Sequence, residues 1–574
     1  MQILTNHIGY DPGTPKRAII KCNSKSPTPG FFTVVTEETN EIVQQGKVVH
    51  SGAVDQWKDW TFWTVDFSAL NKPGKYRLAV QDKNGVTQAT TYPFEIRTHL
   101  IRETISDIMY YFRGQRCADE WNDRDYSVPV FNENRSVDAH GGWYDASGDV
   151  SKYLSHLSYA NYMNPQQTPL CVWGMFKAAA ELAKKNETEE DFGTDKLVTT
   201  LLKEAMFGSD FLVRMQDPCG AFYMTLFDQW TADPEKRMIC EYKTQAGDRY
   251  DTWQCAWRQG GGMSIAALAV AARSGRKRDY TADVYLARAI TGFDHLQEHN
   301  LKYCNDGKEN IIDDYCALLA ATELYATTKE DRFLDAAIVR ADNLINRISS
   351  DSTCSGWMRA DDDGNRTFYH GAEAGLPIIA LLNLVDNTTD AALKERIVKA
   401  VEKLVAFELS VTSEVNNPFG YPRQYVSPVD APKRTSFFIA QKNESGYWWQ
   451  GENARLGSLA CAARYAARHL KGEMATRLND YAANCIDWML GMNPYGVCML
   501  QGRGHNNATY EIGFPNAPGG MCNGITAGFT NENDIDFNPE FPHEATTGMH
   551  RWRWGEQWIP HSAWYILAVG FENN

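Results

Sequence analysis

Helical periodicity is clearest in the stretch Leu201-Leu202-Lys203-Glu204-Ala205-Met206-Phe207-Gly208-Ser209-Asp210-Phe211-Leu212-Val213-Arg214-Met215. Its small and apolar positions alternate between spacings of four and three residues, and they are Leu201, Ala205, Gly208, Leu212 and Met215. This spacing places one apolar stripe on an α-helix, because 3.6 residues complete a turn. Similar patterns follow Arg97 to the carboxyl terminus, so this part of the chain is predicted to be mainly helical.

About twelve helices are predicted from this periodicity, near 99–114, 168–186, 196–216, 260–275, 281–299, 311–327, 329–349, 371–387, 390–411, 450–470, 473–491 and 556–570. Twelve helices suit six helical hairpins closed in a ring, an all-α (α/α)6 barrel. Loops at one end of such a ring surround a common cleft, where residues distant in sequence meet. The stretch from about 492 to 550 is rich in Gly, Asn and Pro and is predicted to be a functional loop.

The first 97 residues have a different pattern, with short apolar runs separated by turn residues. The runs are 18–20, 31–35, 62–65, 76–80 and 92–96. Turn chemistry comes from Lys72-Pro73-Gly74 and Asn84-Gly85. We therefore expect a small antiparallel β-sandwich at 1–97 and a helical domain at 98–574, in keeping with a length of 574 residues.

Composition excludes several classes of protein. Hydrophobic residues make up 43% of the chain and charged residues 22%, as in soluble globular proteins, and no apolar run is long enough to cross a membrane. The net charge of −15 disfavours nucleic acid as a partner. The start of the chain lacks the pattern of a secretory signal, and its 13 cysteines are scattered like reduced thiols, so a cytoplasmic location is expected.

The segment with the most chemical information reads His140-Gly141-Gly142-Trp143-Tyr144-Asp145-Ala146-Ser147-Gly148-Asp149. Asp145 and Asp149 are two carboxylates four residues apart, while Trp143 and Tyr144 offer flat faces on which a sugar ring can stack. An inverting glycosidase needs a carboxylate that takes a proton from water and a carboxylic acid that protonates the departing oxygen. Taken alone, an Asp-rich glycine loop is also typical of a turn, an Asx cap or a calcium site.

The stretch from Gly142 to Asp149 resembles the aspartate signature of glycoside hydrolase family 9. Other segments are similar to the family as well, namely 6–10, 15–18, 111–117, 211–218 and 491–494. The resemblance implies an N-terminal immunoglobulin-like domain, an (α/α)6-barrel catalytic domain and inverting hydrolysis of β-1,4 linkages.

By this resemblance, Asp145 and Asp149 bind the attacking water, with Asp149 as the base and Asp145 as its partner. Ser147 lengthens the commoner Asp-Ala-Gly-Asp form, which leaves open which carboxylate takes the proton. The general acid corresponds to Glu556, whose tryptophan neighbours would raise its pKa. An ordinary glutamate at a helix N-terminus is the alternative.

Substrate-binding residues are also suggested. The segment 444–453 resembles a sugar-binding segment of the family and contributes the candidates Trp448, Trp449, Glu452 and Asn453. The two tryptophans are alternatively core residues. Arg503 and His505 replace the family's sugar-gripping His-His-Arg only loosely, and a structural loop role is the alternative.

Many family members bind zinc through cysteine and histidine. This chain keeps Cys117, but Tyr144 stands where those proteins have histidine. We therefore predict no zinc site and no required cofactor, while calcium remains possible as a structural ion.

The overall sequence looks like the subgroup of exo-β-D-glucosaminidases, which release glucosamine from chitosan oligosaccharides, and Glu452 is the expected partner of the substrate ammonium. The alternative within the family is a β-1,4-glucanase, either an endoglucanase or a cellodextrinase. A sugar epimerase on an α/α barrel is the alternative of another class, with Asp313-Asp314-Tyr315 as a possible part of its site. The ordinary interpretation of that tripeptide is a helix N-terminus.

Overall fold

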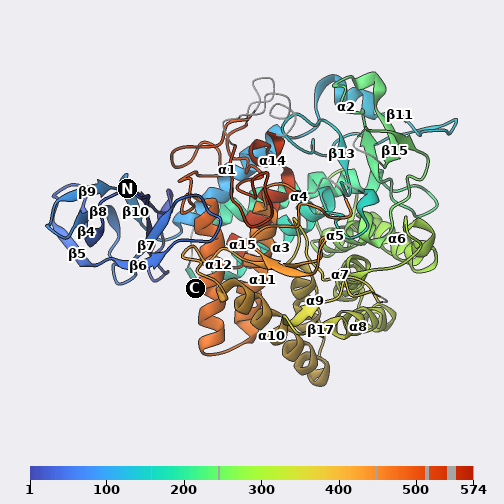
Figure 1. Cartoon of the computed structure of the whole chain (residues 1–574). Coiled ribbons are helices and arrows are strands. Elements are labelled where there is room, and N and C mark those ends of the chain that lie inside the picture. The colour runs from blue at the N-terminus through green and yellow to red at the C-terminus, as the bar shows by residue number, and fades with distance from the viewer. Residues whose placement is uncertain are drawn as a thin grey trace.

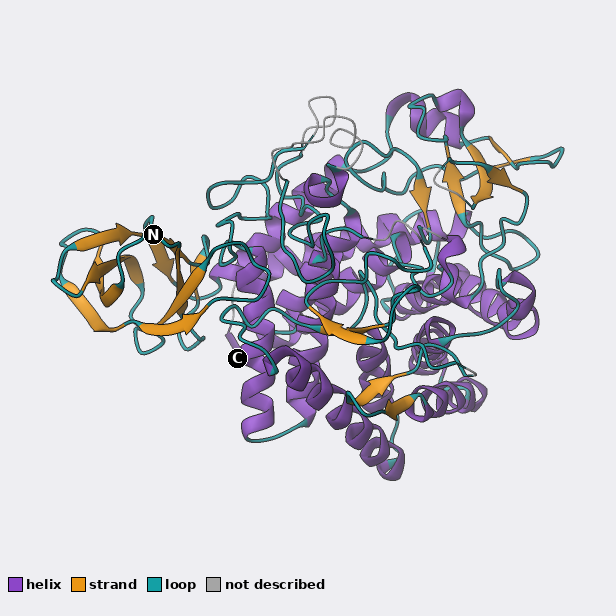
Figure 2. Cartoon of the chain, in the orientation of Figure 1, coloured by secondary structure: helices purple, strands orange, loops and turns teal. Residues whose placement is uncertain are grey.

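The computed structural model describes residues 1–156, 158–189, 192–243, 246–362, 364–445, 449–510, 516–538 and 551–572. Its two parts are separate in Figure 1, where the blue N-terminal strands lie beside a larger body built mainly from helices. Figure 2 shows the same division by secondary structure. The predicted fold, an immunoglobulin-like domain followed by a helical catalytic domain, is confirmed.

The N-terminal domain is a sandwich of two sheets. One has the strand order β1–β3–β7–β6, and the other has the order β2–β10–β8–β4–β5 with β9 paired to β8. The strands are β1 (Gln2–Leu4), β2 (Gly9–Tyr10), β3 (Arg17–Cys22), β4 (Pro29–Thr36), β5 (Ile42–Lys47), β6 (Val49–Gly52), β7 (Thr61–Asp66), β8 (Gly74–Asp82), β9 (Thr87–Thr90) and β10 (Phe94–Ile96). Along β8, Tyr76, Leu78 and Val80 are buried while the residues between them are partly exposed. Alternation of this kind buries one face of the sheet.

Each predicted helix is present in the described chain, with ends that differ by a few residues. They are α1 (Leu100–Gly114), α3 (Thr168–Glu189), α4 (Phe192–Arg214), α5 (Gly261–Arg273), α6 (Ala282–Tyr303), α7 (Ile311–Thr328), α8 (Asp331–Asn346), α9 (Leu376–Asn387), α10 (Ala391–Ser413), α11 (Asn453–His469), α12 (Glu473–Met489) and α15 (Ile559–Gly570). The predicted domain boundary at Arg97 falls between β10 and α1.

The helices are arranged as an inner and an outer layer. Helices α3, α5, α7, α9, α11 and α15 contact one another in this order, and α15 returns to α3, so the inner ring is closed. Helices α4, α6, α8, α10, α12 and α1 pack outside the ring. All inner helices run in the same direction, since each alternates with an antiparallel outer helix. Their N-termini therefore lie at one end of the barrel, together with the loops that precede them.

Short elements decorate these loops. Strands β13 (Lys152–Tyr153), β14 (Thr225–Phe227), β15 (Met238–Tyr242) and β16 (Arg249–Tyr250) form one antiparallel sheet. The other short elements are β11 (Val128–Pro129) with β12 (Ser136–Val137), β17 (Ile348–Ser350) with β18 (Ser355–Met358), β19 (Gln424–Val426) with β20 (Arg434–Ser436), and the helices α2 (Asp119–Asp125) and α14 (Trp552–Gly555). None of these elements was predicted. Strands of two to five residues and helices of four or seven residues are too short to display a repeating pattern.

The two domains share one apolar interface. Trp57 of the sandwich is fully buried and packs against Phe419, Phe437 and Trp488 of the helical domain. Polar contacts add to it, since Asn6 Nδ2 donates to Asp487 Oδ1 at 2.8 Å. The sandwich thus supports loops of the barrel. Within the described part of the chain, no helix combines the length and hydrophobicity that a bilayer crossing requires.

Candidate active site

The predicted catalytic aspartates lie on a tight loop ahead of β13. The backbone of Ala146 pairs with that of Asp149, so the chain reverses direction within four residues. Gly148 has a φ of 91°, which L-residues with a side chain rarely adopt. The turn brings both carboxylates to the same loop end.

This loop is joined to the segment that carries Glu556, although the two lie about 400 residues apart in sequence. Ser147 N donates to Gln557 O at 2.9 Å, and Gln557 N donates to Ser147 Oγ at 2.8 Å. Ile559 N donates to Asp145 O at 3.1 Å. The inserted serine therefore supplies part of the link, and the three predicted catalytic carboxylates belong to one end of the barrel.

Asp145 is buried among nitrogen donors. Its Oδ1 accepts a hydrogen bond from Gln167 Nε2, and its Oδ2 accepts one from Trp558 Nε1 at 3.0 Å. His156 Nδ1 lies 3.4 Å from the same Oδ2. Burial raises the pKa of Asp145 to about 6, while these donors act in the opposite direction by stabilising the carboxylate.

Asp149 has a comparable set of partners. Its Oδ1 accepts a hydrogen bond from Ser151 N at 2.9 Å, and its Oδ2 accepts bonds from Tyr153 Oη at 2.8 Å and Trp230 Nε1 at 3.2 Å. Burial raises the pKa of Asp149 as well. Both aspartates are therefore fixed in orientation by groups that favour their ionised form.

Glu556 lies between α14 and α15, and its side chain is partly exposed. Burial of its carboxyl raises its pKa well above the ordinary value, and the negative charges of Asp149 and Asp145 add to the effect. Asn523 Nδ2 lies 3.5 Å from Glu556 Oε2. A carboxyl with a raised pKa that interacts electrostatically with two carboxylates has the property expected of a general acid that works with a base.

The model of glycosyl hydrolase family 9 matches residues 102–511, and the model of the cellulase N-terminal Ig-like domain matches residues 1–84. The chain belongs to glycosyl hydrolase family 9. It is a glycoside hydrolase.

Individual relatives are distant in sequence. The xyloglucan-specific endo-beta-1,4-glucanase BoGH9A of Bacteroides ovatus is 23% identical over 543 residues, which cover 88% of this chain and 80% of the relative. Endoglucanase D of Acetivibrio thermocellus is 26% identical over 244 residues, covering 38% and 34%. A solved structure of a Bacteroides ovatus family 9 protein aligns with a TM-score of 0.67 and 19% identity over 99% of this chain and 98% of that chain, and so agrees in fold.

The predicted stacking role of Trp143 is wrong. Its indole is fully buried, donates to Glu204 Oε1 at 2.9 Å and packs over Gly208, where a Cβ atom would lie 2.3 Å from the ring. Tyr144 is partly exposed, but its hydroxyl accepts a hydrogen bond from Ala118 N at 3.2 Å. The two rings therefore anchor the loop that carries the aspartates: Trp143 attaches it to α4, and Tyr144 attaches it to residues 115–118.

The predicted role of Glu452 as partner of a substrate ammonium is also wrong. Its carboxylate is buried, pairs with Arg455 Nε at 2.7 Å and accepts a hydrogen bond from Tyr421 Oη at 3.0 Å. Asn453 is buried beside it and donates to Cys522 O at 2.8 Å, so neither side chain is available to a sugar. The spacing of three residues between Glu452 and Arg455 is itself a signal of an ion pair on a helix.

The other two substrate-binding candidates lie on one loop. His505 is at the domain interface, where it stacks on His7 with ring centroids 3.5 Å apart and contacts Tyr92, which agrees with a structural loop role. Arg503 Nε donates to Asp107 Oδ2 of α1 at 2.9 Å, but its side chain is 50% exposed, so sugar binding by Arg503 stays a prediction.

The predicted tryptophan pair is only half described. Trp448 lies outside the described residues. Trp449 is partly exposed, donates to Ala527 O at 3.2 Å and stacks with Arg553, whose guanidinium lies 4.4 Å from the ring centroid. Sugar binding by Trp449 stays a prediction.

Four residues at the aspartates were not predicted from the sequence: Tyr153, His156, Gln167 and Trp230. No motif marks them, and Trp230 is 81 residues from the aspartate it contacts. One signal in the sequence was the concentration of aromatic residues in 223–253, the segment that contains Trp230. Phe227 and Tyr242 of this segment form a cluster with Tyr153 in the small sheet.

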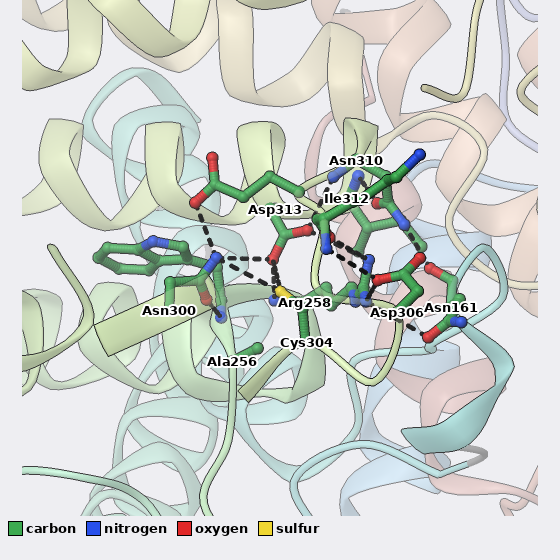
Figure 3. A network of polar contacts seen from close by, with 12 residues as sticks. Asn161, Ala256, Arg258, Asn300, Cys304, Asp306, Asn310, Ile312 and Asp313 are labelled. Carbon is green, nitrogen blue, oxygen red and sulfur yellow. Dashed lines mark hydrogen bonds and ion pairs between the residues drawn. The ribbon is translucent and has the colours of Figure 1, made fainter. Parts of the chain in front are cut away.

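The tripeptide of the epimerase alternative has a structural role. Figure 3 shows Asp313 inside a polar network with Arg258, Asn300 and Asn310. Asp313 Oδ2 accepts a hydrogen bond from Asn310 N at 2.9 Å at the start of α7, and Arg258 Nη1 lies 3.5 Å away. Asp314 pairs with Arg347 at 2.8 Å. These contacts occupy both carboxylates and agree with a helix N-terminus.

The surroundings of Cys117 bear on the zinc that other family 9 members bind. Cys117 Sγ donates to Asp125 Oδ2 at 3.3 Å, and the same buried carboxylate pairs with Lys152 at 2.7 Å and Arg237 at 2.8 Å. In the part of the chain that the structure describes, the carboxylate that contacts the thiol is therefore already paired with two cationic side chains, which does not fit an added metal ion. Among the described residues, no three or more His, Cys, Asp and Glu side chains are grouped as metal ligands would be. The absence of a cofactor, and the possibility of calcium, remain predictions.

Proposed function

We propose that this chain hydrolyses β-1,4-linked glucan chains with inversion of configuration. The observation that carries the proposal is the backbone link between residues 145–149 and 556–559, together with the raised pKa of Glu556, to which the charges of Asp149 and Asp145 contribute. The names of the relatives, a xyloglucan-specific endo-β-1,4-glucanase and endoglucanase D, support this substrate class.

The reaction uses each carboxyl group once. Asp145 and Asp149 hold a water below the sugar ring, and one O–H bond of that water breaks as its proton passes to Asp149. The water oxygen bonds to the anomeric carbon while the glycosidic C–O bond breaks. The departing oxygen takes the proton of Glu556. The single displacement therefore leaves Asp149 protonated and Glu556 ionised.

The test is an incubation with cello-oligosaccharides and xyloglucan oligosaccharides, followed by proton NMR during the first turnovers. The expected first product is the α-anomer of the new reducing end. A first product of β configuration contradicts inversion, and the absence of hydrolysis of every glucan contradicts the substrate class.

An exo-β-D-glucosaminidase acting on chitosan oligosaccharides is the second candidate, and the charge at the site favours it. Asp228 is buried next to the pair, because Ser151 donates to Asp149 through its N–H and to Asp228 Oδ1 through its hydroxyl at 2.8 Å. In the described chain, no lysine or arginine forms an ion pair with Asp145, Asp149 or Glu556. Asp149 and Asp228 therefore concentrate negative charge beside the site, and negative charge attracts a substrate ammonium.

Chitosan oligosaccharides of matched length decide between the candidates. Release of glucosamine monomers at a higher kcat/KM than glucose release supports the second candidate. Hydrolysis of glucans alone excludes it.

We also propose a cytoplasmic location, supported by cysteines that all lie outside disulfide bonds and are mostly buried.

A further inference from the structure

His156 is joined to both catalytic aspartates, although no sequence motif includes it. Its Nδ1 lies 3.4 Å from Asp145 Oδ2, and its side chain retains 23% exposure. The imidazole stacks on Tyr153 with centroids 4.5 Å apart and an interplanar angle of 7°. Tyr153 Oη in turn donates to Asp149 Oδ2 at 2.8 Å.

The direct partners of the two aspartates differ in one respect. Asp149 is held by the neutral donors Ser151, Tyr153 and Trp230. Asp145 is held by Gln167, by Trp558 and by a histidine, whose ring is a cation when both of its nitrogens carry a proton. A cation at ion-pair distance favours the ionised form of a carboxyl and disfavours its protonation.

The other charged and titratable groups near His156 agree with this difference. Asp145 and Asp149 face it from the catalytic loop, and the rings of Tyr153 on β13 and Tyr242 on β15 pack against it. Asp228 lies on the Asp149 side of the pair, where its negative charge favours protonation of Asp149. The charge of His156 lowers the pKa of both aspartates, but only Asp145 is also in direct contact with the ring, and only Asp149 has Asp228 as an opposing neighbour.

We propose that His156 is a positioning residue that keeps Asp145 ionised and thereby directs the proton of the attacking water to Asp149. Asp145, ionised over the pH range in which the enzyme is active, then orients the water as an acceptor, while Asp149 is the base. This inference concerns hydrolysis itself, so it holds for whichever β-linked sugar the enzyme cleaves.

The test is the pH dependence of kcat/KM in His156→Phe, which keeps a ring over Tyr153 but removes the N–H group and the charge. Because Asp145 then loses its cationic neighbour, the acid limb is expected to move about one pH unit upward. His140→Phe is the matched control. His140 also stacks on a tyrosine, Tyr126, and also pairs with an aspartate, Asp138 at 2.6 Å, but contacts neither catalytic aspartate in the described structure.

The outcomes separate positioning from a merely structural role. An upward shift in His156→Phe with an unmoved limb in His140→Phe supports the proposal. A loss of kcat that is equal at every pH overturns it, and so does the same shift in both variants. If His156→Phe fails to fold, His156→Gln, which keeps a donor without a charge, must show the upward shift, and an unshifted limb in that variant overturns the proposal. The assay uses any substrate that the wild type cleaves, so failure of the proposed glucan specificity leaves its result interpretable.

Discussion

Replacing Glu556 by glutamine removes the acid and leaves almost everything else in place. The two side chains have nearly the same volume, and the amide oxygen of glutamine can still accept the long hydrogen bond from Asn523 Nδ2, at 3.5 Å. Burial and the charges of Asp149 and Asp145 raise the pKa of Glu556 well above its ordinary value and so favour its neutral form, which the neutral amide matches. Substrate binding should therefore change little, and KM should be almost unaffected.

The expected loss appears in kcat. A positioned general acid contributes roughly 10²- to 10⁴-fold. Because the raised pKa of Glu556 favours its protonated form, we expect a loss of about 10³-fold, which corresponds to ~4 kcal/mol at 1.36 kcal/mol for each factor of ten.

The assay compares two leaving groups. A natural β-1,4-linked oligosaccharide needs protonation of the departing oxygen, whereas a dinitrophenyl glycoside of the same sugar does not. Glu556→Gln should lose about 10³-fold on the first and less than about tenfold on the second. Glu235→Gln, whose parent side chain is 83% exposed, is the control and should lose neither activity. Equal losses on both substrates would refute the assignment of Glu556 as the acid.

Three further predictions follow from the contacts. The kcat/KM profile should be bell-shaped, because Asp145, with a pKa raised to about 6, must be ionised, and Glu556, with a pKa well above its ordinary value, must be protonated. Activity therefore falls as the pH drops below about 6 and falls again at high pH. A profile without the acid limb contradicts the scheme. Trp230→Phe keeps the ring but loses the N–H group on Asp149, so kcat should fall about tenfold with an unchanged melting temperature, and an unaltered kcat would show that this bond does not matter. Glu452→Gln leaves Arg455 buried without its charge partner, so urea denaturation should report a loss of about 3 kcal/mol at unchanged KM, whereas a raised KM without loss of stability would restore its binding role.

Much of the fold could be predicted because its signals are local. The outer helices have one apolar and one polar face, as in the stretch that contains Leu201 and Leu212, whereas inner helices such as α5 and α9 are long runs of small and apolar residues buried on every side; each helix was recognisable without knowledge of its neighbours. The sandwich strands β3, β4, β7 and β8 were recognisable for the same reason. The small sheet around β14 and β15 was not, because its strands are stabilised by one another and by packed aromatic rings rather than by a repeating pattern.

The supporting residues of the site show where such reasoning fails. Trp143 and Asp145 are two positions apart on one loop, yet the indole enters the core over Gly208 while the carboxylate meets Gln167 and Trp558. The sequence shows two aromatic residues at this loop but not the direction in which their rings point. The indole of Trp143 is directed into the core, where it occupies the space that Gly208 of α4 leaves open.

The amino-acid sequence by itself indicated the two domains, the helices of the barrel and three carboxyl groups as catalytic candidates, since periodicity and short motifs are properties of neighbouring residues. Only the tertiary structure decided which side chains surround those carboxyls. Asp145 is contacted by residues from three separate segments, and Glu556 reaches the site from the far end of the chain. Desolvation and Coulombic interaction depend on distances in space, so the pKa order that makes one carboxyl an acid and another a base exists only after the barrel has closed.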